Sequence, residues 1–160
     1  MGKDDIKQSS DAVLSESQLA DFKERGYLIA DFGLEESMLD TIKQKLQPLY
    51  SEYYQQNPTL PVRIQDGWKT VDEVRQLARN ENIATALQQL LGRQSLPFQT
   101  LNFPIGTRQL THSDTIHFNS IPSNFMVGVW VALEDIDEDN GPLLYYPGSQ
   151  KLQEYTMHDF

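Results

Sequence analysis

The sequence predicts an α+β domain whose helices come first along the chain and whose strands follow. In residues 13–94 apolar side chains recur at the three- and four-residue steps of a helix, whereas residues 95–160 contain short apolar runs separated by Gly, Pro and Asn. A chain of 160 residues with 39% hydrophobic and 22% charged residues fits one globular domain. Residues 1–12 are polar and are predicted to be a flexible N-terminus, so the single domain spans residues 13–160.

The first predicted helix begins at Ser15. Ser15 and Gln18 have the spacing of a capping box, in which each side chain binds the backbone N–H of the other residue. Gly26 stands where a C-cap glycine would end the helix. The segment YLIADF, residues 27–32, then predicts one short strand within the helical part.

Further helices are predicted from the periodicity of apolar residues downstream. Pro48 is predicted to kink or divide the first of them, because proline lacks the backbone N–H. Thr70 and Glu73 have the spacing of a second capping box, and Gly92 is placed to end the last helix. The apolar positions of the long helix are Met38, Leu39, Ile42, Leu46, Leu49, Tyr50 and Tyr53, and those of the last helix are Ile83, Leu87, Leu90 and Leu91.

Three segments in the second part of the chain are typical of strands. They are LPFQTLNF (96–103), NFMVGVWVALEDI (124–136) and GPLLYYPGS (141–149), the last leading into a turn. Within the second segment Trp130 alternates with Gly128 and Ala132 on one face, which leaves space beside the indole. This face is either ordinary core packing or the lining of a barrel that holds a small ligand.

Composition excludes several classes of function. A net charge of −10 argues against a broad surface for nucleic acid or anionic membranes, since Lys and Arg hold both. The absence of Cys excludes disulfides, iron–sulfur clusters and thiolate metal sites, so any metal must use imidazole and carboxylate ligands. No membrane span or apolar signal core is present, which predicts a soluble, cytoplasmic protein. The acidic run EDIDEDNGPL lacks the spacing of an EF-hand and is interpreted as a solvated turn.

The stretch THSDTIHF, residues 111–118, contains the candidate site. On a strand, His112 and Asp114 would point to the same side and Ser113 to the other. An imidazole beside a carboxylate suits iron(II), manganese or zinc, and the same pair could equally bind each other on a polar strand. His117 would point away from the pair, as a structural residue or a residue on the substrate side.

Three ordered segments resemble the phytanoyl-CoA dioxygenase family of iron(II)- and 2-oxoglutarate-dependent oxygenases. THSDTIHF resembles its H-x-D segment, VWVALEDIDEDNGPL its tryptophan strand and acidic turn, and YYPGSQK its Pro-Gly-Ser-His-Lys ending. LSESQLADFKERGYLI also resembles the N-terminal helix and strand of the family, so the likeness covers most of residues 13–152. It implies N-terminal helices packed on a double-stranded β-helix, or jelly roll.

The resemblance also implies site residues and cofactors. Iron(II) would be held by His112 and Asp114, with 2-oxoglutarate and O2 on the metal and a small organic molecule as the substrate to be hydroxylated. Presence of the carboxylate favours hydroxylation over the halogenation of relatives that lack it. Trp130 and Gln99 match positions beside the cosubstrate. The substrate pocket is predicted to include three residues: Thr115, His117 and Phe118.

The sequence departs from the family pattern at two places. Gln150 stands where the Pro-Gly-Ser-His turn has histidine. A distal histidine followed by an arginine, which would pair with 2-oxoglutarate, is not found, because His158 comes too early and no arginine follows residue 110. We therefore expect the metal-bearing first part of an oxygenase, cut within the jelly roll, whose exposed strand edges favour homo-oligomers. The alternatives are an inactive binding or assembly module and a zinc-dependent hydrolase.

Overall fold

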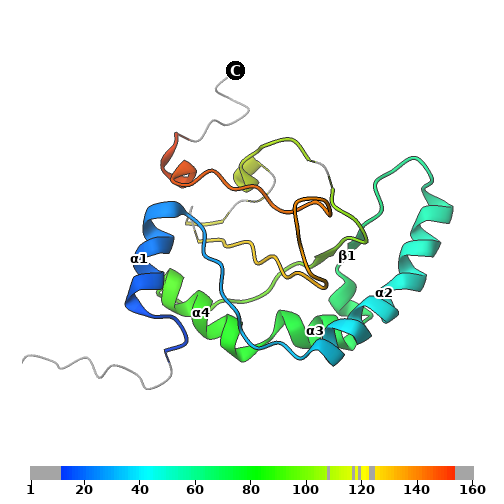
Figure 1. Ribbon diagram of the computed structural model, residues 1–160, viewed down its shortest axis with the longest axis horizontal. Coiled ribbons are helices and arrows are strands. Elements are labelled where there is room, and N and C mark those ends of the chain that lie inside the picture. Colours follow the sequence, from blue (N-terminus) through cyan, green and yellow to red (C-terminus); the bar gives the residue numbers. More distant parts are fainter. Residues whose placement is uncertain (1–11, 108, 117, 119, 123–124, 154–160) are drawn as a thin grey trace, which may run out of the picture.

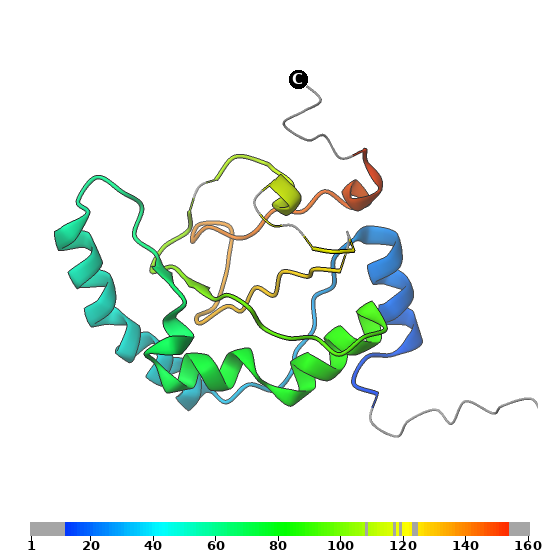
Figure 2. The ribbon, with the colours of Figure 1, turned by 180° about the vertical axis from the view of Figure 1, so that it is seen from behind.

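The computed structural model describes residues 12–107, 109–116, 118, 120–122 and 125–153. The α-helices of this part precede an extended second half, and in the view of Figure 1 they form an arc around the left, lower and right edges of the molecule. Figure 2 shows from behind how the extended segments cross beside the helices. The elements are α1 (Glu16–Arg25), α2 (Glu36–Gln56), β1 (Ile64–Gln65), the 3-10 helix η1 (Gly67–Lys69), α3 (Asp72–Ala78), α4 (Glu81–Leu91), β2 (Leu101–Asn102) and the 3-10 helices η2 (Asp114–Ile116) and η3 (Ser149–Lys151).

The predicted ends of α1 and α4 are confirmed. Ser15 Oγ accepts from the N–H of Gln18 at 3.3 Å, and Gln18 Oε1 accepts from the N–H of Ser15 at 2.9 Å, which completes the capping box. Gly26 and Gly92 end their helices with φ of 83° and 67°, in the left-handed region that glycine adopts at little cost.

The start of α1 is fixed to α4 by one glutamine. The side-chain Oε1 of Gln89 accepts from the backbone N–H groups of Val13 and Leu14, both at 3.0 Å. Its Nε2 donates to Leu14 O at 3.2 Å, and the Leu14 side chain is buried. The residues that directly precede α1 are therefore bound to α4.

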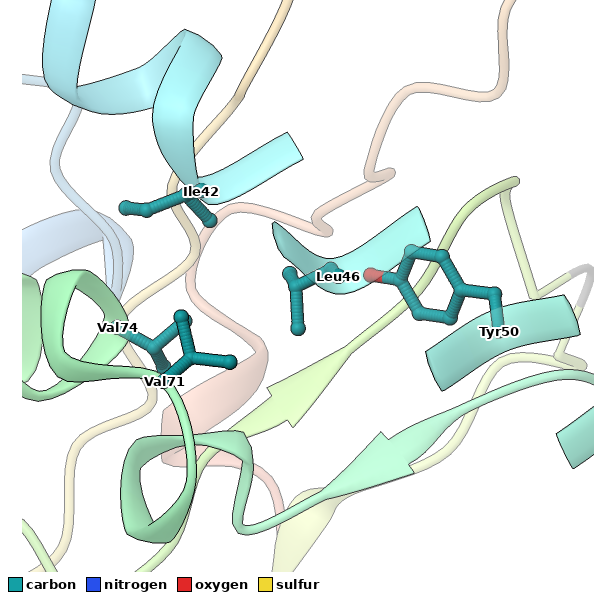
Figure 3. Packing of buried hydrophobic residues seen from close by; sticks show 5 residues of the cluster. All are labelled: Ile42, Leu46, Tyr50, Val71 and Val74. Carbon is teal, nitrogen blue, oxygen red and sulfur yellow. The ribbon is translucent and has the colours of Figure 1, made fainter. Parts of the chain in front are cut away.

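The core lies between α2 and the segment that enters α3. Ile42 and Leu46 are fully buried and face Val71 and Val74 (Figure 3). Tyr50 completes the buried cluster one turn farther along α2. Leu133, from the second half of the chain, packs against this cluster and so joins the two parts of the fold.

Pro48 does not divide α2, which continues from Glu36 to Gln56, whereas a kink at Pro48 stays a prediction. The buried residues on both sides of Pro48 pack on the same core. The predicted capping box of Thr70 and Glu73 was wrong. Thr70 Oγ1 instead donates to Gly67 O at 3.3 Å, and Glu73 binds Lys45 with an Nζ–Oε1 distance of 2.6 Å.

The strands of the described residues are limited to one antiparallel pair, in which Ile64 faces Asn102 and Gln65 faces Leu101. The predicted strand at 27–32 is wrong in this structure, because that segment is extended without a strand partner among the described residues. The described part of segment 124–136 is likewise extended and unpaired. Helices together with one small sheet are compatible with the predicted α+β fold class, whereas the jelly roll stays a prediction. None of the helices in the described ranges is long and apolar enough to cross a membrane.

Candidate metal site

The pair His112 and Asp114 lies on a turn, which corrects the prediction of a strand. His112 has no regular secondary structure, and Asp114 begins η2. The N–H of Phe118 donates to Asp114 O at 3.0 Å, and the hydroxyl oxygens of Ser113 and Thr115 share a hydrogen bond of 2.7 Å. The strand alternation that was expected to bring the two side chains together is therefore absent, because these local bonds fold the chain into a turn.

The side chains of His112 and Asp114 meet despite this difference. His112 Nε2 lies 3.4 Å from Asp114 Oδ1. On the other side of the ring, His112 Nδ1 lies 2.7 Å from the carbonyl oxygen of Leu110. A carbonyl oxygen only accepts hydrogen bonds, so Nδ1 is the protonated nitrogen, and in the neutral ring Nε2 presents its lone pair toward the carboxylate.

This arrangement is chemically suited to holding a cation. Two acceptors that face each other at this distance are stabilised by a proton or a metal ion between them. Metal-binding histidines commonly donate their other ring N–H to a backbone carbonyl, which fixes the tautomer and the orientation of the ring. The Leu110 carbonyl plays this part for His112.

The surroundings of the pair are asymmetric. The His112 side chain is 26% exposed and that of Asp114 is 68% exposed, so the carboxylate is the more accessible ligand. Gly128 lies beside Asp114, since a Cβ built on it would be 3.6 Å from Asp114 Oδ2. Burial raises the pKa of Tyr145 above its ordinary value, and the nearby negative charge of Asp114 adds to this effect. Gly128 therefore borders the carboxylate.

The described residues supply two candidate ligands and no more. Among them, no group of three or more His, Asp and Glu side chains is placed to hold a metal ion. The acidic run is a turn, as predicted: Asp137 Oδ1 accepts from the N–H groups of Asp139 and Asn140, and Asn140 Nδ2 donates to Asp135 O at 2.6 Å. Its polar groups are thus used to close the turn.

Three residues were predicted to line a substrate pocket after the H-x-D pair. Thr115 is in η2 and binds Ser113 through its hydroxyl group. The Phe118 ring packs edge-to-face on Phe98, with ring centroids 6.1 Å apart. His117 lies outside the described residues.

The two residues predicted beside the cosubstrate stay predictions. Gln99 is partly buried and lies two residues before β2, next to Thr100, whose carbonyl oxygen accepts from the N–H of Asp66. Trp130 is 49% exposed and follows Gly128 by two residues along the extended segment. Trp130 is thus two residues along the chain from Gly128, which lies beside the Asp114 carboxylate.

One hollow on the surface lies elsewhere. It has a volume of about 540 Å³ and is bordered by α2, β1 and η1, including Tyr53, Asp66 and Lys69. None of its lining residues belongs to the H-x-D turn, so we do not assign the metal chemistry to it.

Sequence reasoning missed Tyr145 and Tyr27. The Tyr145 ring stacks on that of Tyr27, with centroids 5.2 Å apart and planes inclined by 18°. Tyr145 was read only as part of a strand, and Tyr27 as the start of another. No local pattern could have found the pair, because it joins the end of α1 to a segment more than a hundred residues later.

Comparison with known proteins gives one match. A protein-family model described as phytanoyl-CoA dioxygenase (PhyH) matches residues 10–160. Neither the curated proteins nor the solved structures yielded a match to the chain. The matched range includes the whole H-x-D turn, the tryptophan segment and the Pro-Gly-Ser turn.

Proposed function

The chain belongs to the phytanoyl-CoA dioxygenase family, and on this premise we propose that it is an iron(II)- and 2-oxoglutarate-dependent oxygenase, or the metal-bearing part of one, that hydroxylates a small organic molecule. His112 and Asp114 are the proposed protein ligands. The family match supports the class of enzyme, and the geometry of the turn supports the two residues.

The observation that carries the proposal is the orientation of the His112 ring. Its Nδ1–H is used by Leu110 O, and its Nε2 faces Asp114 Oδ1 at 3.4 Å. Two ligand atoms that each lie about 2.1 Å from one ion, roughly at right angles, are about 3 Å apart. The pair thus fits one metal ion with a small adjustment, and nitrogen with carboxylate oxygen is a donor set that iron(II) accepts.

Each residue has a defined part in this proposal. His112 would bind through Nε2, with its ring held by the Leu110 carbonyl. Asp114 would bind through its exposed carboxylate. The Phe118 N–H donates to the backbone carbonyl oxygen of Asp114 and so fixes the backbone of Asp114 at the start of η2. When bound, iron(II) with 2-oxoglutarate supplies the oxidising chemistry used by oxygenases of this family.

We propose a jelly roll as the fold in which this site works. Support comes from the family match and from the extended course of residues 125–132 and 142–146. The substrate is proposed to be a small organic molecule and not one held by its phosphates. With a net charge of −10, the chain offers little positive surface for the phosphate groups of coenzyme A.

A metal titration tests the proposal directly. Anaerobic calorimetry of the wild-type chain with iron(II) should show one site, and 2-oxoglutarate should tighten it. His112→Ala and Asp114→Ala should each weaken the binding by at least about tenfold, because each removes one of two protein ligands. Asp139→Ala, which removes an exposed carboxylate in the acidic turn, is the matched control and should bind iron as the wild type does.

Activity provides the second test. The chain should convert 2-oxoglutarate to succinate only with iron(II), and both ligand variants should abolish this turnover. Iron binding without turnover would exclude a catalytically sufficient chain and would fit either the metal-bearing part of an oxygenase or the inactive binding module. Unchanged iron affinity in both ligand variants would exclude His112 and Asp114 as the site.

A further inference from the structure

The turn that carries His112 and Asp114 is closed by Phe118, and the ring of Phe118 joins that turn to a distant segment. The Phe118 N–H donates to Asp114 O at 3.0 Å. The Phe118 ring packs edge-to-face on Phe98, with ring centroids 6.1 Å apart and planes inclined by 69°. Phe118 therefore contacts a proposed metal ligand through its backbone and Phe98 through its side chain.

Phe98 belongs to a segment that is bound to the core of the fold. Two residues after it, the Thr100 carbonyl oxygen accepts from the N–H of Asp66 at 2.7 Å, and the Thr100 hydroxyl group accepts from the N–H of Trp68 at 3.4 Å. The Trp68 side chain packs against the buried core cluster, and β2, which directly follows Thr100, pairs with β1. The backbone beside Phe98 is therefore fixed, and its ring gives Phe118 a fixed surface to pack on.

Burial in the core does not account for Phe98. The residue is 61% exposed, so its removal should cost the core little apolar contact. Edge-to-face rings attract each other in addition to the area that they bury. The hydrogen bond between the hydroxyl groups of Ser113 and Thr115 sets the local shape of the turn, but both of its partners lie within the turn. The ring pair, in contrast, joins the turn to the segment before β2.

We propose that Phe98 is a positioning residue for the candidate metal site: its ring holds Phe118 where the Phe118 N–H closes the turn on Asp114 O. This inference rests on the proposed function. Without the ring contact the hydrogen bond from Phe118 opens more often, and the Asp114 carboxylate spends less time opposite His112 Nε2. Because the closed turn is the form that presents both ligands together, the metal affinity falls with the population of that form.

Cobalt(II) titration of the full chain tests this inference, with calorimetry and the visible absorption of bound cobalt as readouts. Phe98→Ala and Phe118→Ala should each lower the cobalt affinity by about twofold to tenfold, the effect that the loss of an aromatic pair typically has. The double variant should lose no more than the weaker-binding single variant, because both changes remove the same contact. Phe98→Tyr keeps the ring pair and should bind cobalt as the wild type does.

Amide exchange of the metal-free chain gives a readout that needs no metal. In NMR measurements of exchange with water, the Phe118 amide should exchange about twofold to tenfold faster in Phe98→Ala, because its hydrogen bond opens more often. The matched control is Tyr54→Ala, which removes a ring of α2 that is 56% exposed. This control should change neither the exchange of the Phe118 amide nor the cobalt affinity.

Urea unfolding establishes that each variant is folded, and Phe98→Leu, which keeps an apolar side chain without a ring, replaces Phe98→Ala if that variant does not fold. Wild-type cobalt affinity in the folded Phe98 variant would overturn the inference, as would unchanged exchange of the Phe118 amide. Additive losses in the double variant, or an equal loss in Tyr54→Ala, would also overturn it. Failure of the wild type to bind cobalt, or binding that survives His112→Ala, would contradict the proposed function instead, and exchange of the Phe118 amide would still decide whether Phe98 holds the turn.

Discussion

Replacing Gly26 with alanine should destabilise the protein more than the same change at Gly92. Both glycines end a helix in the left-handed region, at φ of 83° and 67°. A left-handed residue with a side chain costs about 1–2 kcal/mol, and both variants incur this cost. Open space surrounds Gly92, whereas the new methyl group at position 26 would displace the Gln150 carboxamide. Displacement removes the two hydrogen bonds that Gln150 Nε2 donates to Lys23 O and Glu24 O, each contributing about 0.5–1.5 kcal/mol, so Gly26→Ala should cost about 2–5 kcal/mol in total.

Urea unfolding at neutral pH measures both variants, with linear extrapolation to water. In a Gln150→Ala background the collision with the carboxamide is gone and only the Cβ of residue 150 remains, 3.1 Å from the new methyl group, so Gly26→Ala should cost clearly less than it does in the wild type. This double-mutant cycle isolates the coupling between residues 26 and 150. Equal costs for the two glycine variants in the wild-type background would refute the reasoning, as would a cost at position 26 that is unchanged by removal of Gln150.

Three further predictions concern the core, the pH dependence and self-association. Leu46→Ala should destabilise the protein by about 3–5 kcal/mol in urea unfolding, because Leu46 is fully buried, whereas Leu144→Ala at an 83% exposed position should change stability by less than about 0.5 kcal/mol. Burial raises the pKa of Tyr50 from 10.0 to about 12, so the unfolded chain loses the hydroxyl proton first. Stability that is fully present below pH 10 should thus fall by about 2–3 kcal/mol as the pH rises to about 12, and Tyr50→Phe should remove that part of the pH dependence. Light scattering should detect self-association through the unpaired segment around Val129, and Val129→Lys should weaken it, since charge on an exposed edge opposes strand pairing.

Signals that act within one helical turn were predicted correctly from the sequence. The Ser15–Gln18 box and the glycine at position 26 depend on residues within a few positions of each other. Thr70 and Glu73 have the same spacing as a capping box, yet the Gly67 carbonyl and the Lys45 ammonium bind them instead. The local sequence permits a capping box at this position, but the competing hydrogen-bond partners of Thr70 and Glu73 prevent it from forming.

The strands and the site show where local reasoning ends. A strand requires a partner, and neither segment 27–32 nor residues 125–136 has one among the described residues. His112 and Asp114 were predicted to meet because alternate residues of a strand share a face, and they meet because a turn brings them together. The stacking of Tyr145 on Tyr27 could not be predicted, because it depends on the packing of distant segments.

The position of the pair on a turn implies that its metal affinity has two separable origins. The first origin is local. The hydrogen bond from His112 Nδ1 to Leu110 O sets the tautomer that leaves Nε2 as the donor atom for a metal. The hydrogen bond from the Phe118 N–H to Asp114 O closes the turn that brings the Asp114 carboxylate to Nε2. Remote contacts, such as that with Gly128, border a carboxylate whose side chain is 68% exposed. These origins involve different bonds, and independent effects on a free energy add. A change at the remote contact should therefore alter the metal affinity, while the factor by which His112→Ala lowers that affinity stays the same. A change in that factor would mean that the remote contact also reorients the His112 ring.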